Sequence, residues 1–419
     1  MDTRNAIVEG SSSNTGKFLS VSFNQDYTCF SCSTQNGFMV FNVDPLECKL
    51  SKHFVNANAS GIAIARMLYR TNYVALVGGG RKPRYPPNKL IIWDDLQQRE
   101  SITLSFMSAV TGVFLSRIHI VVALENSIEI YQFGSSPKRL IAPLDTCAGT
   151  AADFVVCQRV TRRPSYTQAS TESGPQTVTR GILAFPSARN PGQVQVADLS
   201  HLQSSELEER SAAQLPTSII KAHKSPIRLI KLSPNGSMVA TCSLQGTLIR
   251  IFSTQNGSLI GEFRRGLDRA DLYEMVWSPR STRLAVVSDK QTLHVFQITD
   301  EDGDMKNKKH VLRDVPFIWK PKYLASTWSM SSLHLHSALK GKSSLNDHDF
   351  YNDRCKLGWC HDGDEDTLIV VWRDSGIWEK YALLEKEPKA YSVNETLQSL
   401  PATQHKKNWE LIRESWRKL

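Results

Sequence analysis

Short apolar runs alternate with turn residues along most of the chain, a pattern that predicts β-strands rather than helices. The runs are rich in Val, Ile, Phe and Thr, and dipeptides such as Asn-Gly, Ser-Pro and Asp-Gly separate them. Seven units repeat a plan of three short strands joined by turns, and they span residues 18–43, 67–95, 110–133, 153–199, 226–254, 272–299 and 328–384. This repeat predicts an all-β fold, a seven-bladed β-propeller with WD-like repeats.

The fifth and sixth units are the most alike. Each contains Ser-Pro, a strand of small residues, the pattern Ser-x-x-x-Thr-Leu, and an apolar strand that ends at Phe252 or Phe296. One unit of this size cannot cover both faces of its own sheet. We therefore expect the units to stand radially, each sheet packed against its neighbours.

Other segments do not follow the repeat of the propeller, which spans residues 18–384. Their polar or densely charged composition predicts loops inserted at about residues 159–179, 300–316 and 333–349. Residues 1–17 are expected to form a flexible N-terminus, and residues 385–419 a polar tail.

The end of this tail carries a helical pattern. Its apolar positions are Trp409, Ile412, Trp416 and Leu419. They fall near one face of a helix over residues 409–419, which predicts a short amphipathic helix. We expect this helix to dock on the propeller, because short apolar stripes are usually packing surfaces; contact with a membrane is the alternative.

The balance of charged residues indicates which class of partner the protein binds. Lys and Arg number 50 against 41 Asp and Glu, a formal net charge of +9 that favours anionic partners such as phospholipid surfaces or nucleic acids. No apolar run approaches the roughly 20 residues that a bilayer-spanning helix needs. The N-terminus also lacks the apolar core of a secretory signal. Membrane contact is therefore expected to be peripheral.

The eight cysteines are expected to be free thiols of a reducing cytosol. Cys29 and Cys32 have the spacing of a metal motif, yet no second CxxC accompanies them. They lie in a strand-like run, where residues three apart face opposite sides of the sheet. We interpret them as buried structural thiols and expect neither a metal nor a cofactor.

Two adjacent arginines lie between the fifth and sixth units, in the motif Phe263-Arg264-Arg265-Gly266. Neighbouring residues of an extended segment point in opposite directions, so one arginine can serve the fifth blade and the other the sixth. The planar guanidinium donates two parallel hydrogen bonds and stays charged, which suits phosphate.

Both flanking units offer matching polar groups. The candidates in the fifth are His223, Thr241, Ser243, Gly246, Thr247 and Arg250, and those in the sixth are Ser288, Thr292 and His294. Hydroxyls donate to phosphate oxygens, and a glycine lets backbone N–H groups approach an anion. These sets predict two similar anion pockets around the arginine pair. The alternative is the internal hydrogen-bond network that Ser, Thr and His build in ordinary WD-type propellers, with a solvated basic pair.

The motif FRRG between two such blades resembles the signature of the PROPPINs, the β-propellers that bind polyphosphoinositides. Further stretches are similar to this family: ALVGGG and NKLIIWDD at 75–80 and 88–95, RIHIVVALENSIEI at 117–130, ATCSLQGTLIRIF at 240–252, and PKYLASTWS at 321–329. The resemblance covers nearly all of residues 18–384 in order. Within the family it extends to the fungal subfamily described as homologous with swollen vacuole phenotype.

The resemblance implies binding of phosphatidylinositol 3-phosphate and phosphatidylinositol 3,5-bisphosphate, with one headgroup in each pocket. It implies a first site of His223, Thr241, Ser243, Gly246, Thr247, Arg250 and Arg264, and a second of Arg265, Ser288, Thr292 and His294. It further implies roles in autophagy, including selective, nucleus-directed micro-autophagy, and in vacuolar and endosomal membrane traffic. A closed propeller needs no partner for stability, so we expect a monomer. Such a protein would lie in the cytoplasm and peripherally on vacuole, endosome and pre-autophagosomal membranes, with autophagy proteins such as a lipid-transfer protein as partners.

The family also inserts a loop of its sixth blade into the bilayer, here the loop at about residues 300–316. Its acidic start argues against deep insertion of that part. The membrane-inserting candidates are Met305, Val311, Leu312 and Val315. Lysines and an arginine lie between them, so apolar groups could enter the headgroup layer while the cations meet anionic lipid.

Three other functions are weighed against lipid binding. A WD-repeat scaffold without direct lipid binding would leave FRRG as a structural element. An RNA-binding propeller would need aromatic stacking platforms beside the basic motif, and only Phe263 lies there, so no nucleic-acid partner is expected. The sequence carries no phosphate-cradling glycine loop with lysine and no nucleophile elbow, and we do not expect an enzyme.

Overall fold

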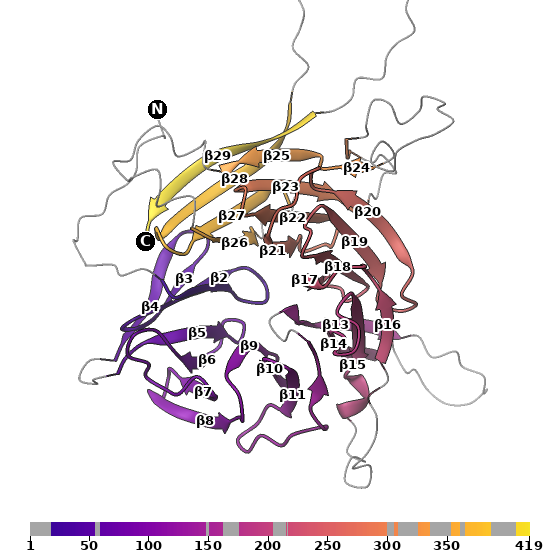
Figure 1. Ribbon diagram of the computed structural model, residues 1–419. Helices are drawn as coiled ribbons and strands as arrows, with labels where there is room; N and C mark the ends of the chain where they lie inside the picture. Colours follow the sequence, from indigo (N-terminus) through magenta and orange to yellow (C-terminus); the bar gives the residue numbers. More distant parts are fainter. Residues whose placement is uncertain are drawn as a thin grey trace, which may run out of the picture.

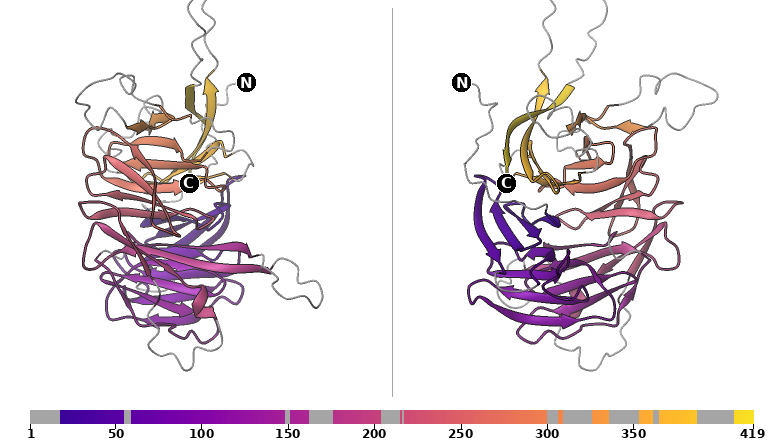
Figure 2. Two further views of the ribbon diagram at one scale, coloured as in Figure 1. Left: turned by 90° about the vertical axis from the view of Figure 1, so that its right-hand side faces the viewer. Right: turned by 60° about the vertical axis from the view of Figure 1, so that its left-hand side comes forward.

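The computed structural model describes residues 18–54, 59–147, 151–161, 176–203, 215, 217–299, 306–308, 326–335, 353–360, 365–386 and 408–419. Within these residues the chain forms seven sheets, six with four strands and one with five. The sheets stand around a common centre like the blades of a propeller (Figure 1), and two side views show the depth of the ring (Figure 2). The predicted seven-bladed β-propeller is confirmed.

Successive stretches of the chain build successive blades. Blade 1 contains β1 (Ser20–Phe23), β2 (Cys29–Thr34), β3 (Gly37–Asn42) and β4 (Glu47–His53). Blade 2 contains β5 (Ile62–Met67), β6 (Tyr73–Gly78), β7 (Lys89–Asp94) and β8 (Arg99–Ser105). Blade 3 contains β9 (Val110–Leu115), β10 (His119–Leu124), β11 (Ser127–Gln132) and β12 (Leu144–Asp145). Blade 4 contains β13 (Asp153–Thr161), β14 (Gln176–Pro186), β15 (Gln193–Asp198) and β16 (Thr217–Lys221), with a 3-10 helix at Ser200–Gln203.

The last three blades have a less regular course. Blade 5 contains β17 (Ile227–Leu232), β18 (Met238–Ser243), β19 (Leu248–Ser253) and β20 (Leu259–Arg264), and the later β24 (Thr327–Trp328) is its fifth strand. Blade 6 contains β21 (Leu272–Trp277), β22 (Arg283–Ser288), β23 (Thr292–Gln297) and β25 (Ser331–His334). Blade 7 contains β26 (Cys355–Trp359), β27 (Thr367–Trp372), β28 (Ile377–Lys386) and β29 (Asn408–Lys418).

Burial along each blade follows from its radial position. The second strands β18 and β22 are buried at every residue, because the neighbouring blades cover both of their faces. The outer strands β4 and β8 are mostly exposed. A continuous apolar run therefore marks the inside of a blade, and an alternating or polar run marks its rim.

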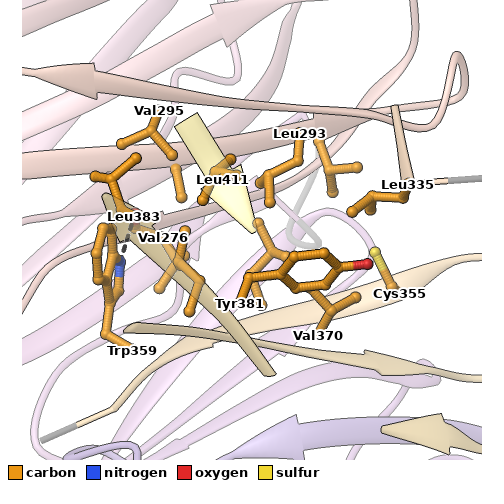
Figure 3. Close-up of a cluster of buried hydrophobic side chains, with 14 of the residues drawn as sticks. Val276, Leu293, Val295, Leu335, Cys355, Trp359, Val370, Tyr381, Leu383 and Leu411 are labelled. Carbon is orange, nitrogen blue, oxygen red and sulfur yellow. Dashed lines mark hydrogen bonds between the residues drawn. The ribbon is translucent and has the colours of Figure 1, made fainter. Parts of the chain in front are cut away.

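Hydrophobic clusters between adjacent blades hold the ring together. Between blades 6 and 7, Trp359 and Tyr381 are fully buried, and Figure 3 shows them among aliphatic side chains such as Leu293 and Val370. Between blades 7 and 1, a further cluster joins Ile369 and Trp378 to Phe18, Phe30 and other side chains of the first blade. Side-chain packing between the two ends of the described chain thus closes the propeller.

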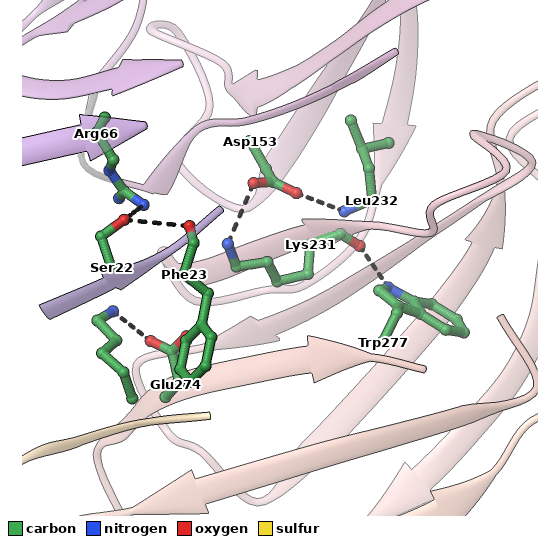
Figure 4. Close-up of polar contacts among 9 residues, drawn as sticks. Ser22, Phe23, Arg66, Asp153, Lys231, Leu232, Glu274 and Trp277 are labelled. Carbon is green, nitrogen blue, oxygen red and sulfur yellow. Dashed lines mark hydrogen bonds and ion pairs between the residues drawn. The ribbon is translucent and has the colours of Figure 1, made fainter. Parts of the chain in front are cut away.

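The first strands of the blades surround a central channel that contains charged side chains. Asp153 accepts a hydrogen bond from the Leu232 backbone N–H at 2.9 Å and pairs with Lys231 at 3.2 Å. Lys356 pairs with Glu274, and the Arg66 guanidinium donates to the Ser22 hydroxyl (Figure 4). These contacts join adjacent blades around the centre, and the residues that line the channel include none of the predicted lipid-binding residues.

The C-terminal segment docks on the propeller as predicted, but the predicted helix over residues 409–419 is wrong. The segment is the strand β29, which pairs antiparallel with β28 along its whole length. A register shift opposite Lys380 and Tyr381 lets Trp409 and Trp416, seven residues apart, both pack against the cluster of blades 6 and 7. Seven residues also make two helical turns, so the apolar spacing alone favoured a helix.

The predicted seventh unit began too early, at residue 328. Trp328 belongs to β24 at the edge of blade 5, and the next strand, β25, completes blade 6. Blade 7 begins at Cys355. In the predicted loop at 159–179, the described ends belong to the long hairpin of β13 and β14. The rest of that loop, most of the other two predicted loops and residues 1–17 lie outside the described residues.

The cysteine interpretation agrees with the structure. Cys29 packs in the cluster between blades 1 and 2, and Cys32 in the cluster between blades 7 and 1, so the two thiols face opposite sides of β2. All eight cysteines are free. Among the described residues, no group of three or more His, Cys, Asp or Glu side chains could hold a metal ion, and no helix could cross a membrane.

Candidate functional site

The FRRG motif lies at the outer end of blade 5, where the chain turns toward blade 6. Phe263 and Arg264 end β20, and Arg265 begins the connection to β21. The Phe263 ring is buried and meets Phe296 of blade 6 edge to face, with ring centroids 5.6 Å apart. Because this contact fixes the end of β20 against blade 6, both arginines are held at the junction of the two blades.

Arg264 is half-buried and contacts a segment that is far away in the sequence. Its Nε donates to the Ser326 hydroxyl at 2.9 Å, and its Nη1 lies 3.5 Å from the Gly266 carbonyl oxygen. Ser326 immediately precedes β24, which pairs parallel with β20.

Arg265 is 8% exposed and lies between the two blades. Its Nε donates to the Gly246 carbonyl oxygen of blade 5 at 3.1 Å, and its Nη2 donates to the Asp268 carbonyl oxygen. Burial lowers the pKa of its guanidinium. On the other side, the charge of Arg265 adds to burial in lowering the pKa of His294 in blade 6. Arg265 thus contacts the fifth-blade turn and acts electrostatically on the sixth-blade set.

Gly246 gives the turn its shape. Its φ is +62°, and a Cβ atom there would lie 1.8 Å from the Ala270 carbonyl oxygen. Only glycine fits both constraints. The turn from Ser243 to Thr247 is therefore packed directly against the connection that contains Arg265.

Three of the predicted fifth-blade residues form a connected network. His223 Nε2 lies 3.0 Å from the Thr241 hydroxyl, which donates to the Arg250 carbonyl oxygen at 3.3 Å. Arg250 in turn pairs with Glu262 at 2.8 Å and donates to the Ala222 carbonyl oxygen at 2.7 Å. Burial, and then the Arg250 charge, lower the pKa of His223 to about 4, so its imidazole is neutral. Thr241 is fully buried within this network.

The side chains of the sixth-blade set form no such connected network of hydrogen bonds among the described residues. Ser288 is fully buried, and its hydroxyl has no hydrogen-bond partner among the described residues. His294 Nδ1 lies 3.2 Å from the Ser329 hydroxyl, and Thr292 Oγ1 lies 3.5 Å from His334 Nδ1. Burial, and then the Arg265 charge, lower the pKa of His294 to about 4. A buried hydroxyl without a partner lowers the stability of the fold.

The structure thus holds Arg264 and Arg265 where blade 5 turns toward blade 6, with Arg265 against Gly246, whereas His223, Thr241 and Arg250 form a network that also contacts Ala222. It adds Ser326 and Ser329, which the sequence analysis did not single out. They follow a long insertion, and Ser326 is 62 residues from Arg264, so no local pattern connects them. Met305, Val311, Leu312 and Val315 lie outside the described residues.

The fold and this junction define a class: a β-propeller with an arginine pair between two sets of Ser, Thr and His side chains. The PROPPIN family model matches residues 187–310, which include the FRRG motif and the predicted sets of both blades. Over its full length the chain is 49% identical to SVP1-like protein 2 of Saccharomyces cerevisiae, and 49% identical to that of Eremothecium gossypii, with 100% of each chain covered. A solved structure of Kluyveromyces lactis Hsv2 with complete loop 6CD matches at a TM-score of 0.67 and 29% identity, covering 96% of this chain and 99% of that one.

The chain belongs to the PROPPIN family, the non-enzymatic β-propellers that bind phosphoinositides and associate with membranes in autophagy. This confirms the family and the fungal subfamily that the sequence resembles.

Proposed function

We propose that this PROPPIN binds phosphatidylinositol 3-phosphate and phosphatidylinositol 3,5-bisphosphate, one headgroup on each side of the arginine pair. The first site consists of Arg264 with the fifth-blade set, and the second of Arg265 with Ser288, Thr292 and His294. One observation carries the proposal: Arg264 and the buried Arg265 lie together at the end of blade 5, and Nη2 of Arg264 has no partner among the described residues. A phosphate oxygen of a headgroup would supply the missing partner through a charge-assisted hydrogen bond.

Membrane recruitment would then combine weak contacts. Two headgroups and the apolar side chains Met305, Val311, Leu312 and Val315 would engage one membrane together, and the effective concentration after the first contact would strengthen the others. We further propose that the protein acts in selective, nucleus-directed micro-autophagy and in vacuolar and endosomal traffic, as a monomer that recruits autophagy proteins such as a lipid-transfer protein. Its place would be the cytoplasm and the surfaces of vacuole, endosome and pre-autophagosomal membranes.

Liposome co-sedimentation tests the lipid-binding proposal. The wild type should sediment with liposomes that contain either of the two lipids and not with liposomes of other phosphoinositides. The double variant Arg264→Thr, Arg265→Thr should stay in the supernatant, because each pocket loses its charge-assisted hydrogen bonds. Arg269→Thr is the matched control, since Arg269 is an exposed arginine of the same connection.

Circular dichroism should verify that each variant is folded. Equal sedimentation of the wild type and the folded double variant would reject the two-pocket proposal and favour a protein-interaction scaffold. If Arg269→Thr lost binding as much as the double variant, the contact would be a general attraction of basic protein to anionic lipid.

A further inference from the structure

Residues 326–335, which we call the return segment, follow the insertion of blade 6 and contact polar groups of both proposed pockets. Ser326 accepts a hydrogen bond from Arg264 Nε at 2.9 Å, and the Ser329 hydroxyl lies 3.2 Å from His294 Nδ1. We propose that Ser326 and Ser329 are positioning residues that orient Arg264 and His294 toward the phosphate groups of the lipid headgroup. This inference rests on the proposed function and deepens it.

Backbone pairing holds the return segment in place. In the parallel pairing of β24 with β20, Thr327 lies opposite Phe263, and Trp328 opposite Arg264. The Trp328 N–H donates to the Lys308 carbonyl oxygen at 2.8 Å, and the Met330 N–H donates to the Val295 carbonyl oxygen at 2.9 Å. Ser326 and Ser329 therefore lie on a segment anchored to both blades.

For Arg264 the consequence is a fixed guanidinium. A free arginine side chain samples many rotamers, and ordering it on binding costs up to about 2 kcal/mol. The contact of Nε with Ser326 holds the plane of the group before a ligand arrives. Nη2 has no partner among the described residues, and the Nη1 contact with Gly266 is long at 3.5 Å. The terminal edge of the guanidinium thus remains available for a bidentate contact with phosphate.

For His294 the consequence is a defined tautomer. Its pKa of about 4 makes the imidazole neutral near pH 7, so only one ring nitrogen carries a hydrogen. If the Ser329 hydroxyl donates to Nδ1, then Nε2 is the N–H nitrogen, and Nε2 has no partner in the described part of the chain. Stacking on Phe296, at 6.2 Å between ring centroids, fixes the ring plane. His294 can then donate from Nε2 to a phosphate oxygen, whereas the other tautomer would present a lone pair.

Calorimetry with soluble, short-chain phosphatidylinositol 3-phosphate tests the role of the two serines without a bilayer, so that loop insertion does not contribute. Ser326→Ala and Ser329→Ala should each weaken binding by about fivefold to tenfold, the usual effect of losing one hydrogen bond to a charged group or its partner. Ser332→Ala is the matched control, because Ser332 is an exposed serine of the same segment. Ser329→Thr should keep the wild-type affinity, since the hydroxyl remains. Thermal unfolding should be alike in all variants.

The tautomer of His294, measured by 15N NMR of the imidazole ring without ligand, tests the inference independently. The wild type and Ser329→Thr should carry the hydrogen on Nε2, and Ser329→Ala should shift toward a mixture of tautomers. If the wild type binds the lipid while both alanine variants bind it equally well and the tautomer is unchanged, the inference is overturned and the proposed function stands. A wild type that does not bind soluble phosphatidylinositol 3-phosphate overturns the proposed function and the inference with it.

Discussion

Blades 5 and 6 carry the same pattern, Ser-x-x-x-Thr with a nearby histidine, yet the two sets of side chains are bonded differently. In blade 5, His223, Thr241 and Arg250 satisfy one another, and Arg250 is further paired with Glu262. In blade 6 the buried Ser288 hydroxyl has no partner among the described residues. His294 contacts Ser329 of the return segment, and Thr292 contacts both the Lys290 carbonyl oxygen of its own motif and His334 of the return segment.

This difference shows that similar sets of polar residues in two neighbouring blades can have two physical roles. A closed network of buried polar groups stabilises a blade, whereas a buried group without a partner costs stability unless a ligand satisfies it. We therefore expect substitutions in the fifth-blade network to act mainly on folding, and substitutions in the sixth-blade set to act mainly on binding.

The largest expected effect concerns the turn that joins the two sets. Gly246→Ala should lower the free energy of unfolding by about 3 kcal/mol, because it combines a left-handed φ with a clash against the Ala270 backbone. Gly266→Ala is the matched control, since a Cβ atom there would meet nothing within 4 Å. Urea unfolding measures both. Equal midpoints for the two variants would mean that the turn is not packed as described.

A second effect is a dependence of stability on pH through the two histidines. Burial lowers the pKa of His223 and of His294 to about 4, from 6.5, so each takes up a proton more readily in the unfolded chain. Their contribution to stability is complete above about pH 6.5 and is lost as the pH falls toward 4. Between pH 7 and pH 5 each should account for about 2 kcal/mol.

Chemical unfolding across this pH range gives the test. His294→Gln and His223→Gln should each flatten the pH dependence by about that amount. A variant that keeps the full wild-type slope would show that its histidine is not buried in neutral form.

The smallest expected changes in stability concern Ser288 and Thr241, and they distinguish the roles of blades 5 and 6 most clearly. Ser288→Ala should raise stability slightly, because it removes a buried hydroxyl that bonds to no described residue, and should weaken headgroup binding by about tenfold. Thr241→Val should do the reverse. It removes the partner of His223 and should cost about 1 kcal/mol of stability, with a smaller effect on binding. The opposite pattern in the two variants would reverse the roles assigned to the blades.

Much of this structure could be predicted from the sequence, because the propeller repeat is local. Each strand carries its own apolar pattern, and the arginine pair lies between two units that both match the pattern. Features formed by distant residues could not be predicted in the same way. The spacing of Trp409 and Trp416 predicts a helix, because seven residues make two helical turns. The segment is a strand, and the register shift that places both side chains on one face arises only from its pairing with β28.

The contacts of the arginine pair show the same limit. Ser326 and Arg264 are in contact although 62 residues separate them in the sequence. The start of the seventh unit is predicted too early for a similar reason: β24 pairs with blade 5 and β25 with blade 6, although both strands follow the three predicted strands of each of these units. A local pattern also cannot reveal which buried hydroxyl is satisfied: the fold gives Thr241 partners among the described residues and gives Ser288 none.

The most direct test of two distinct pockets is the stoichiometry of soluble, short-chain phosphatidylinositol 3-phosphate binding, measured by isothermal titration calorimetry on the wild type and on Ser288→Ala. The account predicts about two headgroups per chain for the wild type, and about one for the variant at ligand concentrations that saturate the fifth-blade site alone. One headgroup per wild-type chain, or the same two sites with unchanged affinities in the variant, would contradict it.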